Sequence, residues 1–85
     1  MTTYNEIMDK AFKDNETIKL GFAELVGFAF ANDDAESLEG ENLYSILEEV
    51  ANEDDYFYNK FYNAIDLVRN RALINEIARV YLLEK

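Results

Sequence analysis

The sequence predicts an all-α protein, a compact bundle of four to five helices formed by a single domain over residues 1–85. Helix-breaking residues are scarce, because the chain has no proline and only three glycines. Apolar residues recur at intervals of three and four along most of the chain, which is the period of one helical face. Since 49% of the residues are hydrophobic, the chain can form one modest core.

The first segment is predicted to be an amphipathic helix that begins at a capping box. Thr3 and Glu6 have the required spacing, in which each side chain accepts a hydrogen bond from the other residue's backbone N–H. The apolar face of this helix consists of Tyr4, Ile7, Met8, Ala11 and Phe12. Asn15 is expected to cap a second helix, with Glu16 near the positive end of that helix.

The second segment carries more apolar surface than one helical face requires. Its main face consists of Ile18, Phe22, Leu25, Val26 and Ala29. Leu20, Phe28 and Phe30 fall on the other sides, and a helix that is apolar nearly all round needs to be covered nearly all round. We therefore expect this helix to lie at the centre of the bundle or in the interface of a homodimer. A strand over residues 17–22, where apolar residues alternate, is the competing interpretation.

A loop over residues 32–40 is predicted to separate the second helix from the third, with one helical turn at residues 35–38 as an alternative. The apolar face of the third helix consists of Leu43, Ile46, Leu47 and Val50. On a helical wheel, Glu41, Glu48 and Glu49 lie on the side away from that face. Residues 52–55 are expected to end this helix and to cap the next one.

The last segment, residues 56–83, contains two apolar stripes. The first consists of Phe57, Phe61, Ile65 and Val68, and the second of Leu73, Ile77, Val80 and Tyr81. Since the two stripes need not be in phase, a kink or break is predicted at Asn70. Tyr56, Tyr58 and Tyr62 either form an aromatic contact patch or keep their phenol tips in water around core-facing phenylalanines. We favour the second interpretation.

The side chains that most enzymes use are absent from the chain. It has no histidine and no cysteine, which excludes catalysis by Ser-His or Cys-His pairs and zinc sites built on thiolates. The acidic loop also fails the EF-hand pattern: with Asn32 at the first position, Ser37 replaces the required glycine and Leu43 the required glutamate. We expect no catalytic activity, no cofactor and no resident metal.

The net charge of −10 restricts the partners that the chain can bind. Direct contact with nucleic-acid phosphates needs clustered Lys and Arg, and an anionic membrane surface would repel this protein. The most apolar run, residues 20–31, is too short to span a bilayer and contains Glu24. The amino terminus has no apolar segment of the signal-peptide type. We therefore expect a soluble protein in the cytoplasm.

The acidic residues are concentrated in one part of the chain. Residues 20–59 contain no Lys or Arg, whereas basic residues occur on both sides of that stretch. A solvated helix ordinarily intersperses both signs, so an unbroken series of like charges adds self-repulsion to the folded state. The carboxylates of residues 32–55, which we call the acidic band, are Asp33, Asp34, Glu36, Glu39, Glu41, Glu48, Glu49, Glu53, Asp54 and Asp55. The acidic band is either a merely solvated surface or a surface that binds a partner, and we favour the second by a small margin.

Carboxylates along a helix can imitate the phosphates of a DNA strand. Steps of four and seven residues advance about 6 and 10 Å along a helix axis. Phosphates of one strand recur at about 3.4 Å of axial rise, which gives a spatial separation of similar order. The acidic band could thus present a row of anionic points to the basic groove of a DNA-binding protein.

The amino terminus shows a resemblance to a known family. The positions that carry it are Thr3, Tyr4, Asn5, Ile7, Asp9, Ala11 and Phe12. This pattern resembles the start of the Ocr-type antirestriction proteins of phages, which implies an acidic, largely helical dimer that imitates DNA and blocks restriction enzymes. In size and acidity the chain is also similar to small phage anti-CRISPR proteins.

These observations together predict a non-catalytic inhibitor that is encoded by a phage or another mobile element and acts in the cytoplasm of a bacterial host. Its partner would be a basic nucleic-acid-binding protein, a restriction enzyme or a CRISPR effector, and the inhibitor itself would form a homodimer. The alternative is a helical interaction or regulatory module that binds a partner through its apolar and tyrosine surface, with acidity serving only solubility. Charge reversal at Glu48, Glu49, Asp54 and Asp55 would discriminate the two.

Overall fold

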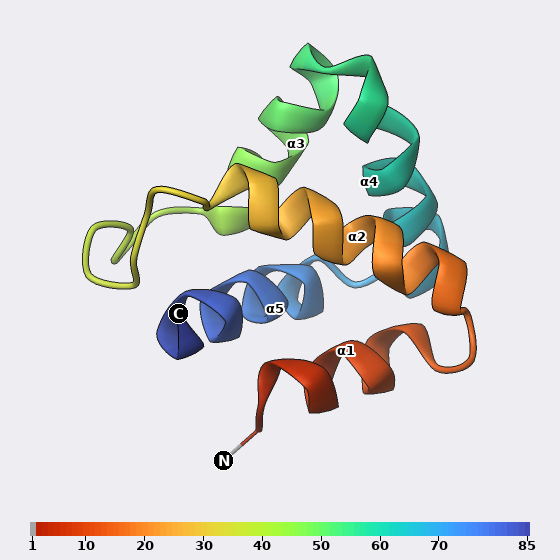
Figure 1. Ribbon diagram of the computed structural model, residues 1–85, viewed down its shortest axis with the longest axis horizontal. Coiled ribbons are helices and arrows are strands. Elements are labelled where there is room, and N and C mark those ends of the chain that lie inside the picture. The colour runs from red at the N-terminus through yellow and green to blue at the C-terminus, as the bar shows by residue number, and fades with distance from the viewer. Residues whose placement is uncertain (1) are drawn as a thin grey trace.

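Five helices surround one apolar core in the computed structural model, which describes residues 2–85 (Figure 1). In chain order they are α1 (Tyr4–Phe12), α2 (Glu16–Ala29), α3 (Leu43–Glu53), α4 (Asp55–Val68) and α5 (Arg71–Glu84). Because residues 2–85 contain no strand, the all-α prediction and the predicted number of helices are confirmed. The strand alternative at residues 17–22 is wrong, since those residues form the first turns of α2. No helix in the described part of the chain is long and apolar enough to cross a membrane.

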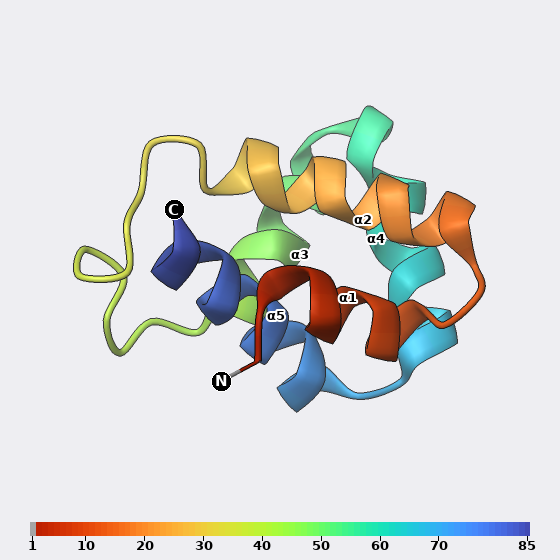
Figure 2. The ribbon, with the colours of Figure 1, turned by 60° about the horizontal axis from the view of Figure 1, so that its bottom comes forward.

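The helices pack in two groups about α2. In Figure 1, α1 and α5 lie below α2, while α3 and α4 meet in a corner above it. The view turned by 60° shows α1 and α5 side by side, in agreement with their packing contacts (Figure 2). Four phenylalanines are almost completely buried in the core. They are Phe12 on α1, Phe22 on α2, Phe30 directly after α2, and Phe61 on α4. The molecule measures 32 × 30 × 19 Å along its principal axes.

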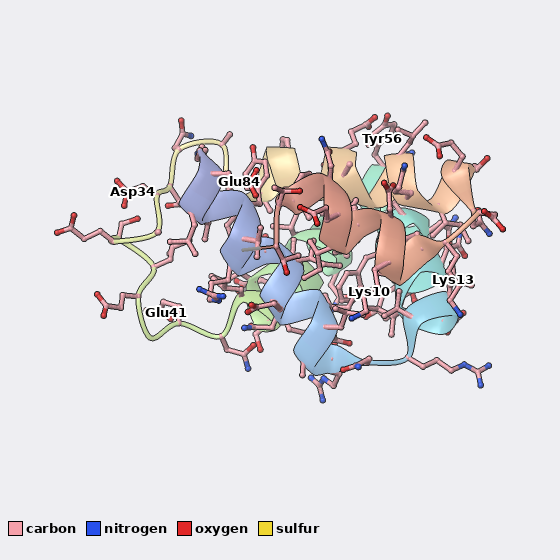
Figure 3. All side chains as sticks on the ribbon, turned by 90° about the horizontal axis from the view of Figure 1, so that it is seen from below. Lys10, Lys13, Asp34, Glu41, Tyr56 and Glu84 are labelled. Atoms are coloured by element: carbon pink, nitrogen blue, oxygen red, sulfur yellow. The ribbon has the colours of Figure 1, made fainter. Side chains whose placement is uncertain are left out.

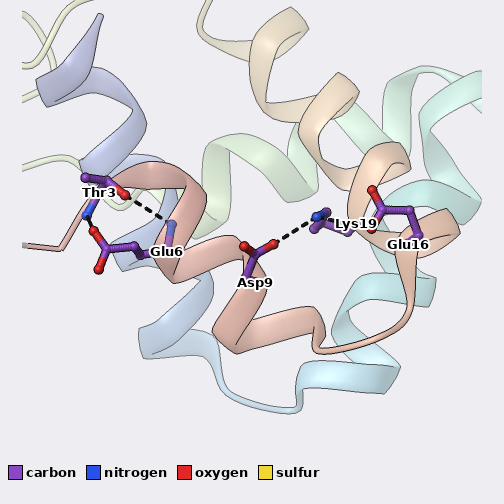
Figure 4. A network of polar contacts seen from close by, with 5 residues as sticks. All are labelled: Thr3, Glu6, Asp9, Glu16 and Lys19. Atoms are coloured by element: carbon purple, nitrogen blue, oxygen red, sulfur yellow. Dashed lines mark hydrogen bonds and ion pairs between the residues drawn. The ribbon is translucent and has the colours of Figure 1, made fainter.

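The predicted caps of the first two helices are confirmed. The Thr3 hydroxyl accepts a hydrogen bond from the Glu6 backbone N–H at 3.1 Å, and the Glu6 carboxylate accepts one from the Thr3 N–H at 3.2 Å (Figure 4). Asn15 caps α2 by accepting from the Ile18 N–H at 3.1 Å. Such caps satisfy backbone donors that a helix leaves unpaired at its start.

An ion-pair network then fixes α1 against α2. The Lys19 ammonium lies 2.9 Å from the Asp9 carboxylate of α1 and 3.2 Å from Glu16 of its own helix (Figure 4). These two carboxylates raise the pKa of Lys19, with the hydrogen bond to Asp9 as the larger cause. Lys19 is therefore neutralised locally and does not offset the acidic band.

Most of the remaining boundaries also lie where the sequence places them, although α3 begins at Leu43 and not directly after residue 40. α4 ends at Val68, Arg69 adopts a left-handed conformation with a φ of 52°, and the Asn70 side chain caps α5 by accepting from the Leu73 N–H at 3.1 Å. The predicted break at Asn70 is thus confirmed. Residues 35–38 of the loop form hydrogen-bonded turns and not a helix.

Candidate partner-binding surface

The acidic band occupies three consecutive parts of the structure. Five of its carboxylates lie in the loop between α2 and α3, two lie on α3, and three lie where α3 meets α4. In Figure 1 this path runs from the loop at the left, along α3, to the corner at the top. Since α3 has 11 residues, it is roughly 16 Å long. The carboxylates of the loop and those at the corner are therefore separated by about the length of α3.

The carboxylates of the acidic band are not neutralised by ion pairs. Among residues 2–85, ion pairs join Lys19 to Asp9 and Glu16, and Arg79 to Glu76, and none includes a member of the band. Seven members are exposed, and the three half-buried ones are Asp33, Glu48 and Asp54. The band therefore presents unpaired negative charge to the solvent.

The helical-wheel prediction for the third helix needs correction. Glu41 lies in the loop, because Asn42 caps α3 by accepting from the Ser45 N–H at 3.2 Å and the helix begins only at the next residue. Glu48 lies half-buried on the flank of α3, so that only Glu49 of the three is an exposed residue of the helix. Its neighbour on the outer face is Glu53, four residues later.

Two members of the band stabilise local backbone structure. The Asp34 carboxylate accepts from the Ser37 N–H at 2.7 Å, and hydrogen bonds from Ser37 hold the pKa of Asp34 below its usual value. Asp54 caps α4 by accepting from the Tyr56 N–H at 2.9 Å. Replacing either residue would alter the fold locally as well as the charge, so neither is suited to testing the surface.

The stability of α3 does not explain why positions 49 and 53 carry negative charge, as Glu49 and Glu53 do. Like charges four residues apart on one helix repel each other. Glu53 also lies in the last turn of α3, where the helix dipole favours a cation and where no basic residue is present. Asp55, in contrast, lies in the first turn of α4, where a negative charge is favourable. We call Glu49, Glu53 and Asp55 the corner carboxylates.

The fold brings one basic residue to the loop, which the sequence pattern did not indicate. The Lys85 ammonium donates to the backbone carbonyls of Phe30, Ala31 and Asp33, the last two at 2.9 and 2.6 Å. It thereby compensates the negative end of α2, and its attraction contributes to the lowered pKa of Asp34. The loop end of the band is consequently less negative than the sequence implies.

Charge is still separated along the molecule. Figure 3 shows Asp34 and Glu41 at one end of its long direction and Lys10 and Lys13 towards the other. Lys10 and Lys13 are exposed residues at the end of α1 and in the turn that follows it. Asp14 and Glu16 are also exposed near these lysines, so this end is close to neutral and the loop end is the more negative of the two. A basic partner would thus be attracted to the loop end.

A second surface of interest is apolar and lies across α2 and α4. Leu20 and Phe28 on α2 are each 58% exposed, and Tyr56 on α4 is 59% exposed. The ring centres of Phe28 and Phe57 lie 4.8 Å apart, and this contact connects the two helices. We call Leu20, Phe28 and Tyr56 the aromatic face.

The aromatic face carries one acid and one base. The Glu24 carboxylate interacts with the Tyr56 phenol and thereby raises the pKa of that tyrosine. The Lys60 ammonium lies 4.6 Å from the centre of the Tyr56 ring, within cation–π range. This face is therefore neutral in sum, unlike the acidic band.

The prediction that the phenylalanines between the tyrosines face the core is confirmed. Phe57 and Phe61 are buried, whereas Tyr56 and Tyr58 are exposed and Tyr62 is half-buried. The Tyr62 hydroxyl donates to the Asn52 side chain at 3.1 Å, which ties α4 to the end of α3. The phenylalanines thus form core, and the phenol tips reach water or polar groups.

The comparisons with known proteins do not identify the chain. No protein-family model, curated protein or solved structure gives a match. Among residues 2–85, no three acidic side chains lie close enough together to hold a metal ion. The assignment of function therefore rests on the charge and geometry of the two surfaces.

Proposed function

We propose that the protein is a small acidic inhibitor, encoded by a phage or another mobile element, that binds the nucleic-acid groove of a restriction enzyme or a CRISPR effector. It acts stoichiometrically, with carboxylates of the acidic band in the positions that phosphates would take. The observation that carries the proposal is the set of exposed, unpaired corner carboxylates, Glu49, Glu53 and Asp55, two of which local helix energetics do not favour.

The spacing of these carboxylates suits a groove that binds phosphates. Glu49 and Glu53 are one helical step of four residues apart, or about 6 Å along α3. Lys and Arg side chains of such a groove are long and adaptable, and Arg can bind a carboxylate and a phosphate in the same two-pronged manner. Long-range attraction between the acidic band and the groove would also accelerate the encounter.

The test is a DNA-cleavage assay with a purified restriction enzyme and a purified CRISPR effector, each titrated with the protein. We expect inhibition of one of them to reach completion near an equimolar ratio. The variant Glu49→Gln/Glu53→Gln should lose up to about tenfold in inhibitory potency, because two exposed charge pairs with the target, each worth up to about 1 kcal/mol, are removed. The variant should remain as stable as the wild type, since it relieves a repulsion within α3.

The matched control is Asp14→Asn/Asp66→Asn, which changes the net charge by the same amount at exposed positions outside the acidic band. It should retain the potency of the wild type. Equal losses in the two double variants would mean that only the overall charge matters, and the mimicry proposal would be wrong. Absence of inhibition of both enzymes at a large molar excess would also overturn it.

The aromatic face supports a homodimer as part of the same proposal. Two copies of a chain with a charge of −10 repel each other, so their contact is most favourable where the surface is neutral. Leu20, Phe28 and Tyr56 supply apolar area there, and Glu24 of one copy can pair with Lys60 of the other across a twofold axis.

Analytical ultracentrifugation tests the dimer. Sedimentation should give a dimer for the wild type and a monomer for Leu20→Ser/Phe28→Ser. The control Leu67→Ser, on a different part of α4, should remain dimeric.

The aromatic face also favours the second candidate function, an interaction module for an apolar partner. In that case Leu20→Ser/Phe28→Ser would lose partner binding while Glu49→Gln/Glu53→Gln would retain it. The inhibitor proposal predicts the reverse: Glu49→Gln/Glu53→Gln should weaken binding to the target more than Leu20→Ser/Phe28→Ser does.

A further inference from the structure

Three hollows lie beside α5 and are built from a different set of residues than the corner. The central hollow has a volume of about 410 Å³ and lies between the loop and the second half of α5. A hollow on one side of it shares Gly40, Glu41 and Asn75 with the central hollow. A hollow on the other side shares Arg79 and Leu83 with it. The three hollows are thus neighbours along α5, and Arg79 and Leu83 stand between the central one and the last. We call the central hollow the groove.

The wall that α5 contributes has a simple repeat. Residues four apart on a helix lie on the same face, and α5 places such a series along the hollows. The series is Arg71, Asn75, Arg79 and Leu83. Since the α5 residues of the groove run from Asn75 to Leu83, the groove follows the helix for roughly 12 Å, the length of about four residues of extended chain. That length suits a peptide segment of a partner better than a small molecule.

The opposite wall is held in place by a contact between distant parts of the chain. The Asn75 side-chain oxygen accepts from the backbone N–H groups of Leu43 and Tyr44, at 2.9 and 3.2 Å. These are the first two donors of α3, so α5 caps α3. The groove is therefore a fixed feature of the fold, with the end of the loop anchored to α5.

The groove combines apolar and acidic residues. Its apolar lining consists of Ala35, Leu38, Leu43, Leu82 and Leu83. Glu36, Glu39 and Glu41 also line it, and all three are exposed and form no ion pair within residues 2–85. Arg79 does not offset them, because its guanidinium is held by Glu76 through two hydrogen bonds, one of them at 2.7 Å. The pair of Arg79 and Glu76 is neutral in sum, so the groove is negative overall.

We infer that this groove binds a segment of the target protein in which apolar side chains are flanked by Lys or Arg. The leucines of the lining accept the apolar side chains, and Glu36, Glu39 and Glu41 pair with the flanking basic ones. Charge complementarity selects this occupant over a second copy of the chain, whose net charge of −10 would be repelled by the groove. The inference rests on the proposed function, since both assign a basic target, and it adds an apolar anchor that phosphate mimicry does not supply.

The first test uses a defined probe in place of the target. The peptide Lys-Lys-Leu-Leu-Lys-Lys is titrated into the ¹⁵N-labelled full-length protein, and amide chemical shifts are followed. We expect the largest shifts at Gly40, Leu43, Asn75 and Leu83, and small ones at Glu49. The matched peptide Lys-Lys-Ser-Ser-Lys-Lys should bind about tenfold more weakly, because it lacks the apolar side chains. Equal affinity of the two peptides, or largest shifts at the corner, would overturn the inference.

Two substitutions provide the second test. Leu83 is 57% exposed, so Leu83→Ser should leave the fold intact and weaken binding of the leucine peptide about tenfold. Leu67, which is 44% exposed and lies outside the groove, is the control, and Leu67→Ser should bind the peptide as the wild type does. If Leu83→Ser instead abolished a dimer and left peptide binding unchanged, the groove would hold a second copy and the inference would be wrong.

The two proposals can fail separately. If the leucine peptide does not occupy the groove while Glu49→Gln/Glu53→Gln still loses inhibition, the groove inference is wrong and the inhibitor proposal stands. If the peptide occupies the groove while neither enzyme is inhibited, the groove inference is supported and the inhibitor proposal is wrong.

Discussion

Tyr4 packs its ring into the interface of α1 and α5 but leaves its hydroxyl without a partner. Its ring lies 5.3 Å from that of Tyr81, in an edge-on arrangement. Within the described residues, the Tyr4 hydroxyl is a buried polar atom that has no hydrogen-bond partner. Burial, with a smaller contribution from Tyr81, raises the pKa of Tyr4 to about 12. The Tyr4 ring therefore contributes packing to the core, whereas its hydroxyl contributes no hydrogen bond.

The variant Tyr4→Phe tests this interpretation. At neutral pH its free energy of unfolding should equal that of the wild type or exceed it by up to about 1 kcal/mol, since an unsatisfied polar atom is removed. Above about pH 10 the unfolded wild type releases the Tyr4 proton and the folded protein does not, so the wild type loses stability as the pH rises towards 12. The advantage of Tyr4→Phe should consequently grow with pH in urea unfolding followed by circular dichroism. A variant that is clearly less stable than the wild type at neutral pH would contradict this account.

At the scale of the elements, local signals determined most helix boundaries and were visible in the sequence. Thr3, Glu6 and Asn15 each cap a helix through a residue three positions away, so the pattern alone predicts them. Asn70, where only a kink or break was predicted, caps α5 over the same distance. The cap that Asn75 provides for α3 was missed, because it joins residues 32 and 31 positions apart. Only the packing of α5 against α3 brings it into place.

Asn75 therefore offers a prediction about how the elements stabilise each other. Asn75→Ala should lower the free energy of unfolding by about 1–2 kcal/mol, because two backbone donors of α3 lose their acceptor. Asn75→Asp keeps an acceptor oxygen and adds a negative charge near the positive end of α3, and it should be as stable as the wild type. Urea unfolding of the three proteins measures the difference. Equal stability of the alanine and aspartate variants would show that the cap contributes nothing.

At the scale of the whole molecule, the fold class and the position of the acidic band followed from the sequence, while the charge balance of the band did not. Composition and periodicity depend only on neighbours along the chain and predicted the bundle. Lys85 reaches the end of α2 from more than 50 positions away and compensates the loop, which no local pattern indicates. For the same reason the groove beside α5, formed by residues from both halves of the chain, was not foreseen.

The separation of charge over the molecule makes the proposed binding sensitive to salt. Exposed charges are screened over about 10 Å at 0.1 M ionic strength and about 3 Å at 1 M. The corner carboxylates are exposed and unpaired, so their attraction to a basic groove should be largely lost across that range. Apolar contacts, such as those of the aromatic face, would be affected little.

The most direct test is calorimetric measurement of Kd for the inhibited enzyme at about 0.1 M and about 1 M salt. We predict that Kd rises by roughly two orders of magnitude for the wild type, and by clearly less for Glu49→Gln/Glu53→Gln, in which fewer charge pairs are left to screen. A Kd that is the same at both salt concentrations would contradict the mimicry of phosphates.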